Sequence, residues 1–309
     1  MKTNLLLVCL LLLPLRLFSA PGDYVVMSVK GKVEYKKNGK GQFLALTVGA
    51  QLTPKDIVKT SFTSYAKVMF KQKQLLTIDE NTTIQIQALA SQSAGERSEK
   101  ESAAGKIMAY VVDRMTKSGS KNKAQNYLGG VRAGDEMFNA AFPRKGFILT
   151  TQPVFEWINT GDKSNYTFKL LDENLSAVVE RKIDTTKFYY SAEQPKLQDG
   201  KRYIWNVIRQ TDGRESDYVT FSILPRDTAE MVQKELASLA EELKKMNADE
   251  IIIHIIKGTY FEQKDLLYDA FMEYRDAVKL APDILEYREM ANAVLYKMGL
   301  YNEERALLH

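Results

Sequence analysis

The spacing of hydrophobic and polar positions changes along the chain and divides it into regions. Up to about residue 90, and again from about 147 to 224, apolar residues alternate with polar ones in short runs, which is typical of half-buried β-strands. From Asp227 onward apolar residues recur every three to four positions, which predicts amphipathic helices. We therefore expect a multidomain protein that is mainly β in its first two thirds and all-α at its C-terminus.

The first β region combines alternating strands with a strong turn signal. Ala66, Val68 and Phe70 occupy alternate positions, as expected for one face of a strand. The dipeptide Asn38-Gly39 tolerates the positive φ angles that a tight hairpin turn requires. These features predict a small, twisted antiparallel β unit.

Short motifs in this region carry a family resemblance. They are Gly31-Lys32-Val33, Val48-Gly49-Ala50-Gln51-Leu52, Asp56-Ile57-Val58-Lys59-Thr60, Ser64-Tyr65-Ala66-Lys67-Val68, Gly105-Lys106-Ile107 and Gly130-Val131-Arg132-Ala133-Gly134. Their spacing resembles that of a FecR-type domain, which we expect to span residues 22–140. Two corners depart from the family pattern, because Lys55 and the stretch Gln72-Lys73-Gln74 replace glycines.

The resemblance implies a limited function. The family is named after regulators that pass an envelope signal to a sigma factor through a cytoplasmic segment before the membrane helix. Here four residues precede the apolar run at the N-terminus. We therefore expect a scaffold-like or sensing use of the β domain rather than direct control of a sigma factor.

Between the two β regions the chain is rich in small and charged residues. This composition predicts a flexible insert at about 91–130, including the basic run Lys117–Lys123, which we interpret as a solvated loop. Inside the insert, Ile107 and Met115 belong to a set of apolar residues at helical spacing. Tyr110-Val111-Val112 would serve equally well as a buried strand, so the sequence leaves both structures open.

The second β region, at 145–225, predicts a β-sandwich. Its strand-like segments are separated by turn dipeptides such as Asp199-Gly200 and Asp212-Gly213. The set Leu197, Gly200, Tyr203 and Trp205 resembles the corner of fibronectin type III and immunoglobulin-like domains, in which a tyrosine hydroxyl ties a connection to a strand.

The helical region, at 227–309, resembles a tetratricopeptide repeat. Its small, aromatic and proline residues fall at the favoured positions: Gly258, Phe261, Ala270, Tyr274, Ala277 and Pro282. A second repeat is incomplete at His309, and repeats bury their faces on neighbours. We expect the helix at 227–246 to cover one side, and the sandwich, a second copy or a partner to cover the other.

The N-terminal stretch has the parts of a secretory signal peptide. Lys2 is a positive start, Leu5 to Leu15 form an apolar run, and Ser19-Ala20 offers small residues for cleavage. The run is shorter than the roughly 20 residues that span a bilayer. We expect a signal peptide at 1–20 and a protein of the periplasm or cell envelope, with an uncleaved anchor as the alternative.

Length, charge and composition narrow the function classes. The 309 residues suggest two or three domains, each with a core of its own, and 45% hydrophobic residues exclude a disordered chain. The net charge of +4 is spread thinly, so we expect no nucleic-acid partner. The single cysteine, Cys9, follows Val8 rather than a small residue, so we interpret it as hydrophobic filler and not a lipid attachment site.

Candidate chemistry is sparse. No phosphate-binding loop, nucleophile elbow or dinucleotide fingerprint is present in the sequence, and His254 lies in an apolar helix-like stretch. The neighbouring carboxylates Asp79-Glu80 and Glu241-Glu242 are explained by a turn and a solvated helix face. We therefore predict no catalytic residue, no metal site and no cofactor.

Five residues are candidates for binding: Asp56, Thr60, Trp157, Trp205 and Tyr274. For Asp56 we favour a turn in which it bonds nearby backbone groups over a binding role. The two tryptophans could stack a sugar, but alternation turns them inward, so we favour a place in the core. We predict a non-catalytic envelope scaffold that binds envelope proteins through its C-terminal helices. A receptor for peptidoglycan, another glycan or a peptide, a component of envelope signal sensing, and a homo-oligomer are alternatives.

Overall fold

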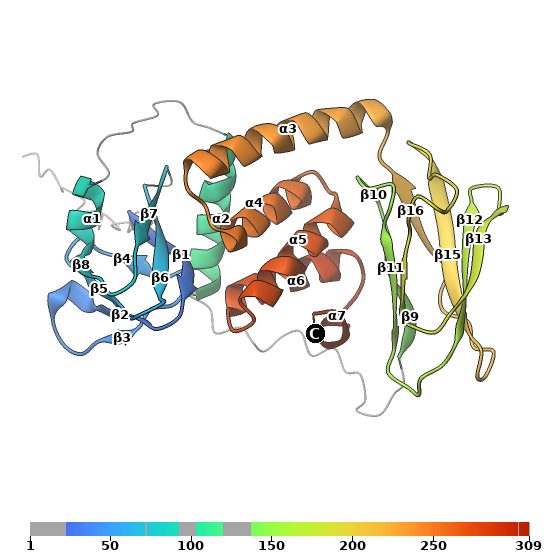
Figure 1. Ribbon diagram of the computed structural model, residues 1–309, viewed down its shortest axis with the longest axis horizontal. Helices are drawn as coiled ribbons and strands as arrows, with labels where there is room; N and C mark the ends of the chain where they lie inside the picture. The colour runs from blue at the N-terminus through green and yellow to red at the C-terminus, as the bar shows by residue number, and fades with distance from the viewer. Residues whose placement is uncertain (1–22, 72, 93–102, 120–136, 302, 309) are drawn as a thin grey trace, which may run out of the picture.

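A computed structural model describes residues 23–71, 73–92, 103–119, 137–301 and 303–308 of the chain. A layer of helices lies between an N-terminal β unit and a β-sandwich, which gives the molecule an elongated form (Figure 1). The expected order of β regions followed by C-terminal helices is therefore correct. The expected signal peptide, Cys9 and the motif Gly130–Gly134 lie outside the described residues.

The N-terminal β unit contains two four-stranded sheets. Their strand orders are β4-β1-β6-β7 and β3-β2-β5-β8, and their pairs are antiparallel. The elements are β1 (Tyr24–Lys30), β2 (Val33–Lys36), the 3-10 turn (Lys37–Gly39), β3 (Leu44–Ala45), β4 (Gln51–Leu52), β5 (Ile57–Thr60), β6 (Tyr65–Phe70), β7 (Gln74–Ile78), β8 (Thr83–Gln85) and α1 (Ile86–Gln92). Asn38 and Gly39, with φ of 50° and 68°, turn the β2–β3 hairpin as predicted.

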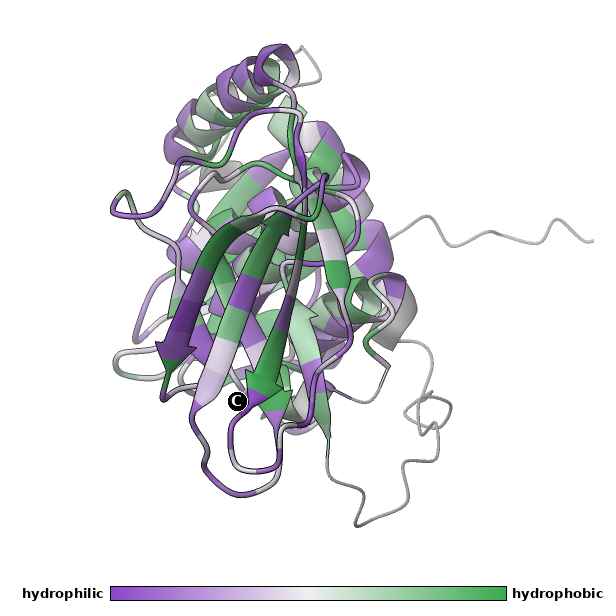
Figure 2. Ribbon diagram, turned by 90° about the vertical axis from the view of Figure 1, so that its right-hand side faces the viewer, coloured by the Kyte–Doolittle hydropathy of each residue, from purple (hydrophilic) through white to green (hydrophobic). Residues whose placement is uncertain are grey.

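The sandwich packs a five-stranded sheet, in the order β10-β16-β15-β12-β13, on a three-stranded sheet, in the order β14-β11-β9. The strands are β9 (Phe138–Phe142), β10 (Phe147–Ile148), β11 (Val154–Asn159), β12 (Tyr166–Asp172), β13 (Ala177–Ile183), β14 (Lys187–Tyr189), β15 (Arg202–Arg209) and β16 (Val219–Ile223). In β12 the predicted alternation is confirmed, because Tyr166, Phe168 and Leu170 are buried and the residues between them are partly exposed. Figure 2 looks onto this end of the molecule and shows hydrophilic and hydrophobic residues mixed along the facing strands.

The expected boundary at residue 140 is wrong. It cuts through β9, whose residues pair with β11 of the sandwich. The sandwich therefore begins before the segment that turn signals and alternation had marked. The reason is that β9 is a short strand, Phe-Asn-Ala-Ala-Phe, in which two small alanines weaken the alternating pattern.

The helical layer contains α2 (Ala103–Gly119), α3 (Arg226–Lys245), α4 (Glu250–Gln263), α5 (Leu267–Leu280), α6 (Leu285–Lys297) and the short α7 (Glu304–Leu307). Part of the expected flexible insert is thus the helix α2, and the strand alternative at Tyr110–Val112 is wrong. Its residues Ile107, Val111 and Met115 are buried. Figure 1 shows α2 beside α3 and α4, so this segment belongs to the helical layer, while 93–102 and 120–136 lie outside the described residues.

The helical layer docks on the sandwich through α5. The ring of Phe271 stacks on Phe142, with the ring centroids 4.6 Å apart. The backbone N–H of Val154 donates to the Tyr268 hydroxyl (3.0 Å), and Arg275 pairs with Glu156 (2.8 Å). The helix α3 also packs on these helices, as expected, because Val232, Leu239 and Leu243 belong to the same core. Of the alternatives for the other side, the sandwich is the one that the structure shows.

The hydrophobic core crosses the boundaries between these regions. One cluster of buried residues extends from the sandwich through the helices to the face of the β unit that carries Val25, Met27 and Val48. A second cluster, around Val58 and Val68, fills the β unit itself. The expectation of a separate core for each domain therefore holds for the β unit, whereas the sandwich and the helices share one. Among the described residues, no helix combines the length and hydropathy of a bilayer-spanning segment.

Candidate functional site

A hollow lies between the N-terminal β unit and the helices. Its volume is about 1000 Å³. One wall comes from the end of β1 and the segment Leu46–Gln51, and the other from the start of α4 and the connection between α5 and α6. We call this hollow the interdomain groove. Ligand sites occur preferentially at such junctions between domains.

Hydrogen bonds across the junction fix the two walls of the groove. The Tyr287 hydroxyl donates to the backbone carbonyl of Met27 in β1 (2.8 Å). The Lys67 ammonium donates to the carbonyl of Asn247 (2.8 Å), just before α4. Both contacts join positions far apart in the sequence, so the groove is set by tertiary packing.

A glycine on the groove wall allows α2 to pack closely against the β unit. Gly49 has a φ of 77°, in the left-handed region that favours glycine. A Cβ at this position would lie 3.1 Å from the carbonyl oxygen of Met115 in α2. The glycine at position 49 is thus explained by its turn and by the contact with α2.

The floor and rim of the groove combine apolar and acidic residues. Leu280 and Leu285 expose 45% and 55% of their surface, although large apolar residues are usually covered. The charged lining residues are Asp249, Glu250, Asp283, Glu286 and Lys30, which amounts to four carboxylates and one ammonium group. The groove therefore has the opposite sign of charge from the chain as a whole, which carries +4.

Partial burial in the groove raises the pKa values of two of its titratable groups. Burial, together with the nearby carboxylate of Asp249, raises the pKa of Tyr65 to about 12. Burial and the neighbouring Glu289 raise the pKa of Glu286. Asp249 is also the N-cap of α4, because its carboxylate accepts the backbone N–H of Ile252 (2.9 Å). Its position on the wall is therefore fixed by the helix that it begins.

The predicted site residues Asp56 and Thr60 hold turns together. The Asp56 carboxylate is buried and accepts the backbone N–H groups of Asn38 (2.7 Å) and Thr53 (2.8 Å). The Thr60 hydroxyl accepts the N–H of Thr82 (2.9 Å). The structure places neither residue in the groove. Of the two interpretations of Asp56, the turn is the one observed.

Trp157 and Trp205 are core residues and present no face for a sugar to stack on. They expose 2% and 0% of their surface. The indole N–H of Trp205 donates to the carbonyl of Pro143 (2.7 Å), and its ring meets Phe155 edge-on. Their inward orientation is the one that strand alternation predicted.

Tyr274 belongs to a buried polar cluster that the sequence did not reveal. Its hydroxyl donates to the Glu262 carboxylate (2.8 Å), which also accepts from Arg114 of α2 (2.6 Å) and Lys297 of α6 (2.7 Å). Burial opposes ionisation of Glu262, but Arg114 and the other donors lower its pKa overall. This cluster, here named the Glu262 cluster, binds α2 to α4, α5 and α6.

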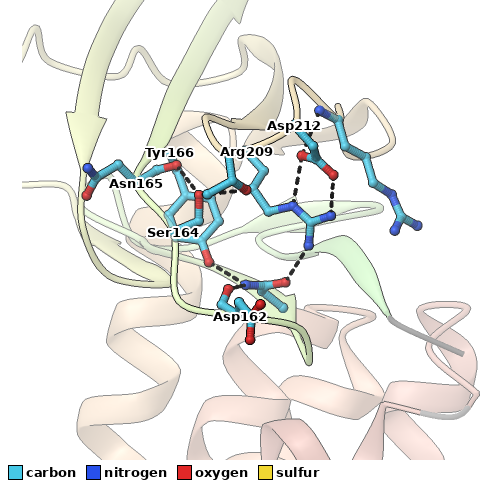
Figure 3. Close-up of polar contacts among 9 residues, drawn as sticks. Asp162, Ser164, Asn165, Tyr166, Arg209 and Asp212 are labelled. Carbon is cyan, nitrogen blue, oxygen red and sulfur yellow. Dashed lines mark hydrogen bonds and ion pairs between the residues drawn. The ribbon is translucent and has the colours of Figure 1, made fainter. Parts of the chain in front are cut away.

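A second polar cluster lies at one end of the sandwich (Figure 3). The Arg209 guanidinium donates to both carboxylate oxygens of Asp212 and to Asn159. The amide of Asn159 in turn donates to the carbonyl of Asp162 (2.8 Å) and to the Tyr166 hydroxyl (2.7 Å). The groups satisfy one another, so the cluster fixes the loops at this end.

The carboxylates and the histidine considered for catalysis have structural partners. Glu80 accepts the backbone N–H of Thr63 (2.7 Å), and Glu242 accepts that of Ala104 (2.7 Å). His254 contacts Glu273 (2.7 Å). Within the described part of the chain, no three His, Cys, Asp or Glu side chains are grouped to hold a metal ion.

Comparison with known proteins identifies no family. No protein-family model and no curated protein matches the chain. Among solved structures it is similar to an α-L-rhamnosidase from Dictyoglumus thermophilum, with 15% identity over 30% of this chain and 12% of that one and a TM-score of 0.22. It is also similar to a β-1,2-glucanase from Parabacteroides distasonis, with 11% identity over 46% of this chain and 24% of that one and a TM-score of 0.24. The chain thus spans a quarter or less of these enzymes, and likeness at this level carries no argument.

Proposed function

We propose that this protein is an exported, non-catalytic scaffold of the cell envelope, which binds other envelope proteins at the interdomain groove. The observation that carries the proposal is the exposure of Leu280 and Leu285 in a groove whose walls are fixed by the Tyr287 and Lys67 hydrogen bonds. A preformed groove with exposed apolar residues is typical of a protein-binding surface. The pattern of the first 20 residues supports export.

Local contacts support the finer assignment of each module. A FecR-like β unit is supported by the motif turns at Gly49 and Asp56. A fibronectin type III or immunoglobulin-like sandwich is supported by the Tyr203 hydroxyl, which accepts the backbone N–H of Gln198 (2.9 Å). A tetratricopeptide-like hairpin is supported by the contact between Gly258 and Tyr274.

The partner surface differs from the one that the sequence suggested. We predicted that the C-terminal helices bind partner proteins and that the sandwich, a second copy or a partner covers their open side, and α2 and the sandwich contact these helices. The buried tryptophans also offer no face to a glycan, which favours a protein partner. We therefore assign assembly with other proteins, or with a second copy, to the groove instead of the repeat face.

Affinity recovery from crosslinked envelopes tests this function. A truncation before α3 would expose Phe142 and other core residues, so point variants are preferable. We expect the wild-type chain to recover specific envelope proteins and the double variant Leu280→Asp, Leu285→Asp to lose them. The matched control is Leu175→Asp, in an exposed turn of the sandwich, where the leucine is 67% exposed. Recovery of the same proteins by all three would contradict a scaffold role for the groove.

A further inference from the structure

We propose that the interdomain groove binds an extended, positively charged polypeptide segment of a partner protein. The inference rests on the proposed scaffold function and specifies the chemistry of the partner. It follows from the charge of the groove, from the path of β1 along it, and from the position of its exposed leucines.

The acidic lining of the groove indicates that the partner segment is positively charged. Asp249, Glu250, Asp283 and Glu286 outnumber Lys30, although basic residues are in excess in the chain as a whole. The Glu250 side chain is 74% exposed, so it is open to an incoming cation. Acidic walls attract a basic segment and repel an acidic one, which provides specificity and a faster encounter.

The path of β1 along the groove indicates that the partner segment is extended. On its β4 side, Tyr24 and Val25 pair with β4, and Val26 exchanges hydrogen bonds with Gly49 and Ala50. The groove continues along β1 beyond this point, where Val29 and Lys30 line it. A segment that lies there runs beside a strand edge, the arrangement in which added strands bind through their backbone.

The exposed leucines indicate that the partner segment also carries apolar side chains. Leu280 and Leu285 stand on the wall opposite β1, at the two ends of the connection between α5 and α6. The carboxylates Asp283 and Glu286 lie in or beside the same connection, so the segment meets apolar and acidic side chains on one wall. The occupant therefore combines Lys or Arg with apolar residues, as a repeat of lysine and leucine does.

Fluorescence anisotropy of the purified chain with a labelled Lys-Leu-Lys-Leu-Lys-Leu peptide tests the inference. We expect binding that weakens several-fold when salt is raised from about 50 to about 300 mM, because exposed charges are screened. The triple variant Glu250→Gln, Asp283→Asn, Glu286→Gln should bind about tenfold more weakly. The matched triple Glu180→Gln, Asp184→Asn, Glu193→Gln, on the sandwich, makes the same change in net charge and should stay within about twofold of the wild type.

Several results would overturn the inference. Equal weakening by the two triple variants would mean a general charge effect, and equal binding of Glu-Leu-Glu-Leu-Glu-Leu would remove the charge selectivity. Unchanged binding of the Lys-Leu peptide after N-methylation of alternate backbone amides would exclude a segment held along β1. A gain of about fivefold or more on changing Lys117, Lys121 and Lys123 to serine would identify this chain's own basic run as the occupant.

The same variants separate this inference from the scaffold function. If the groove triple recovers the same envelope proteins as the wild type and the leucine double variant loses them, the scaffold function stands, but its partner does not depend on the acidic residues and the inference fails. If the peptide binds as expected while no envelope protein is recovered, the chemistry of the groove is supported and the scaffold function fails.

Discussion

The ring of Tyr274 lies against the backbone of Gly258 where α4 and α5 cross. A Cβ added at Gly258 would lie 2.6 Å from two ring atoms, which is closer than side chains can approach. Glycine at this position therefore sets the distance between the two helices. The Tyr274 hydroxyl is held by Thr259 and Glu262, so the ring has no free direction in which to move.

Substitution of Gly258 by alanine should destabilise the protein, although alanine favours a helix. We expect a loss of about 1–3 kcal/mol in the free energy of unfolding, since overpacking outweighs a gain in helix propensity of up to about 1 kcal/mol. Urea denaturation followed by circular dichroism measures the change. Ser238→Ala, at an exposed position of α3, should be nearly neutral. A more stable Gly258→Ala variant would show that the helices can separate freely.

Replacement of Tyr203 by phenylalanine removes one hydroxyl from the sandwich. That hydroxyl accepts the N–H of Gln198, so its loss leaves a donor without its partner. We expect a cost of about 0.5–1.5 kcal/mol by thermal or urea unfolding. The control is Tyr189→Phe, because Tyr189 is 67% exposed. Equal losses of stability at the two positions would show that the hydrogen bond between Gln198 and Tyr203 does not stabilise the sandwich.

The Glu262 cluster should be sensitive to the loss of its acceptor. Glu262→Ala leaves the Arg114 guanidinium, whose side chain is 20% exposed, without its carboxylate. We expect a destabilisation of about 3–5 kcal/mol, as for other buried ion pairs from which one partner is removed. Glu241→Ala, on the exposed face of α3, should change stability by less than about 0.5 kcal/mol. A loss below about 1 kcal/mol for Glu262→Ala would mean that the Glu262 cluster contributes little to holding α2.

Asp269 should make the junction between α5 and the sandwich dependent on pH. Burial raises the pKa of its carboxyl from 3.8 to about 7, even though the backbone N–H of Leu149 donates to it (3.0 Å). Between these two values the folded state holds a proton that the unfolded chain releases. The stabilising contribution of this group is therefore complete below about pH 4 and is lost as pH rises through about 7.

A comparison of Asp269→Asn with the wild type isolates this effect. The amide oxygen of asparagine still accepts from Leu149 but carries no charge at any pH. Relative to the wild type, the variant should gain about 2–4 kcal/mol in unfolding free energy between about pH 4 and about pH 8. Other carboxyl groups are common to both chains and cancel. A difference between the two chains that does not change with pH would refute the raised pKa.

Local patterns in the sequence predicted local structure well. Alternation placed Phe168 and Trp205 in the sandwich core, where the structure has them. Burial by alternation depends on neighbours within one strand. The same patterns missed β9, because its alanines blur the alternation, and they left α2 undecided.

The interdomain groove could not be predicted in this way. Its walls, near residues 30 and 285, are joined by the contact between Met27 and Tyr287, which are separated by 260 positions. Likewise Arg114 finds Glu262 across 148 positions. The periodicity of apolar residues does not indicate contacts between residues that are far apart in the sequence. The acidic residues of the groove are also far apart in the sequence and come together only in the folded chain. The five candidate binding residues stood out in the sequence because turn and core positions have recognisable patterns, and the structure places them in turns and cores.

Photocrosslinking in intact cell envelopes tests the central claim most directly. A benzophenone amino acid at position 285 would stand in the interdomain groove, and the same group at position 175 would stand on the sandwich, at a leucine of similar exposure. We predict a discrete crosslinked protein from position 285 that is absent from position 175 and is lost in the variant with Glu250, Asp283 and Glu286 neutralised. No adduct at position 285, or the same adducts from both positions, would contradict a groove that binds a partner protein.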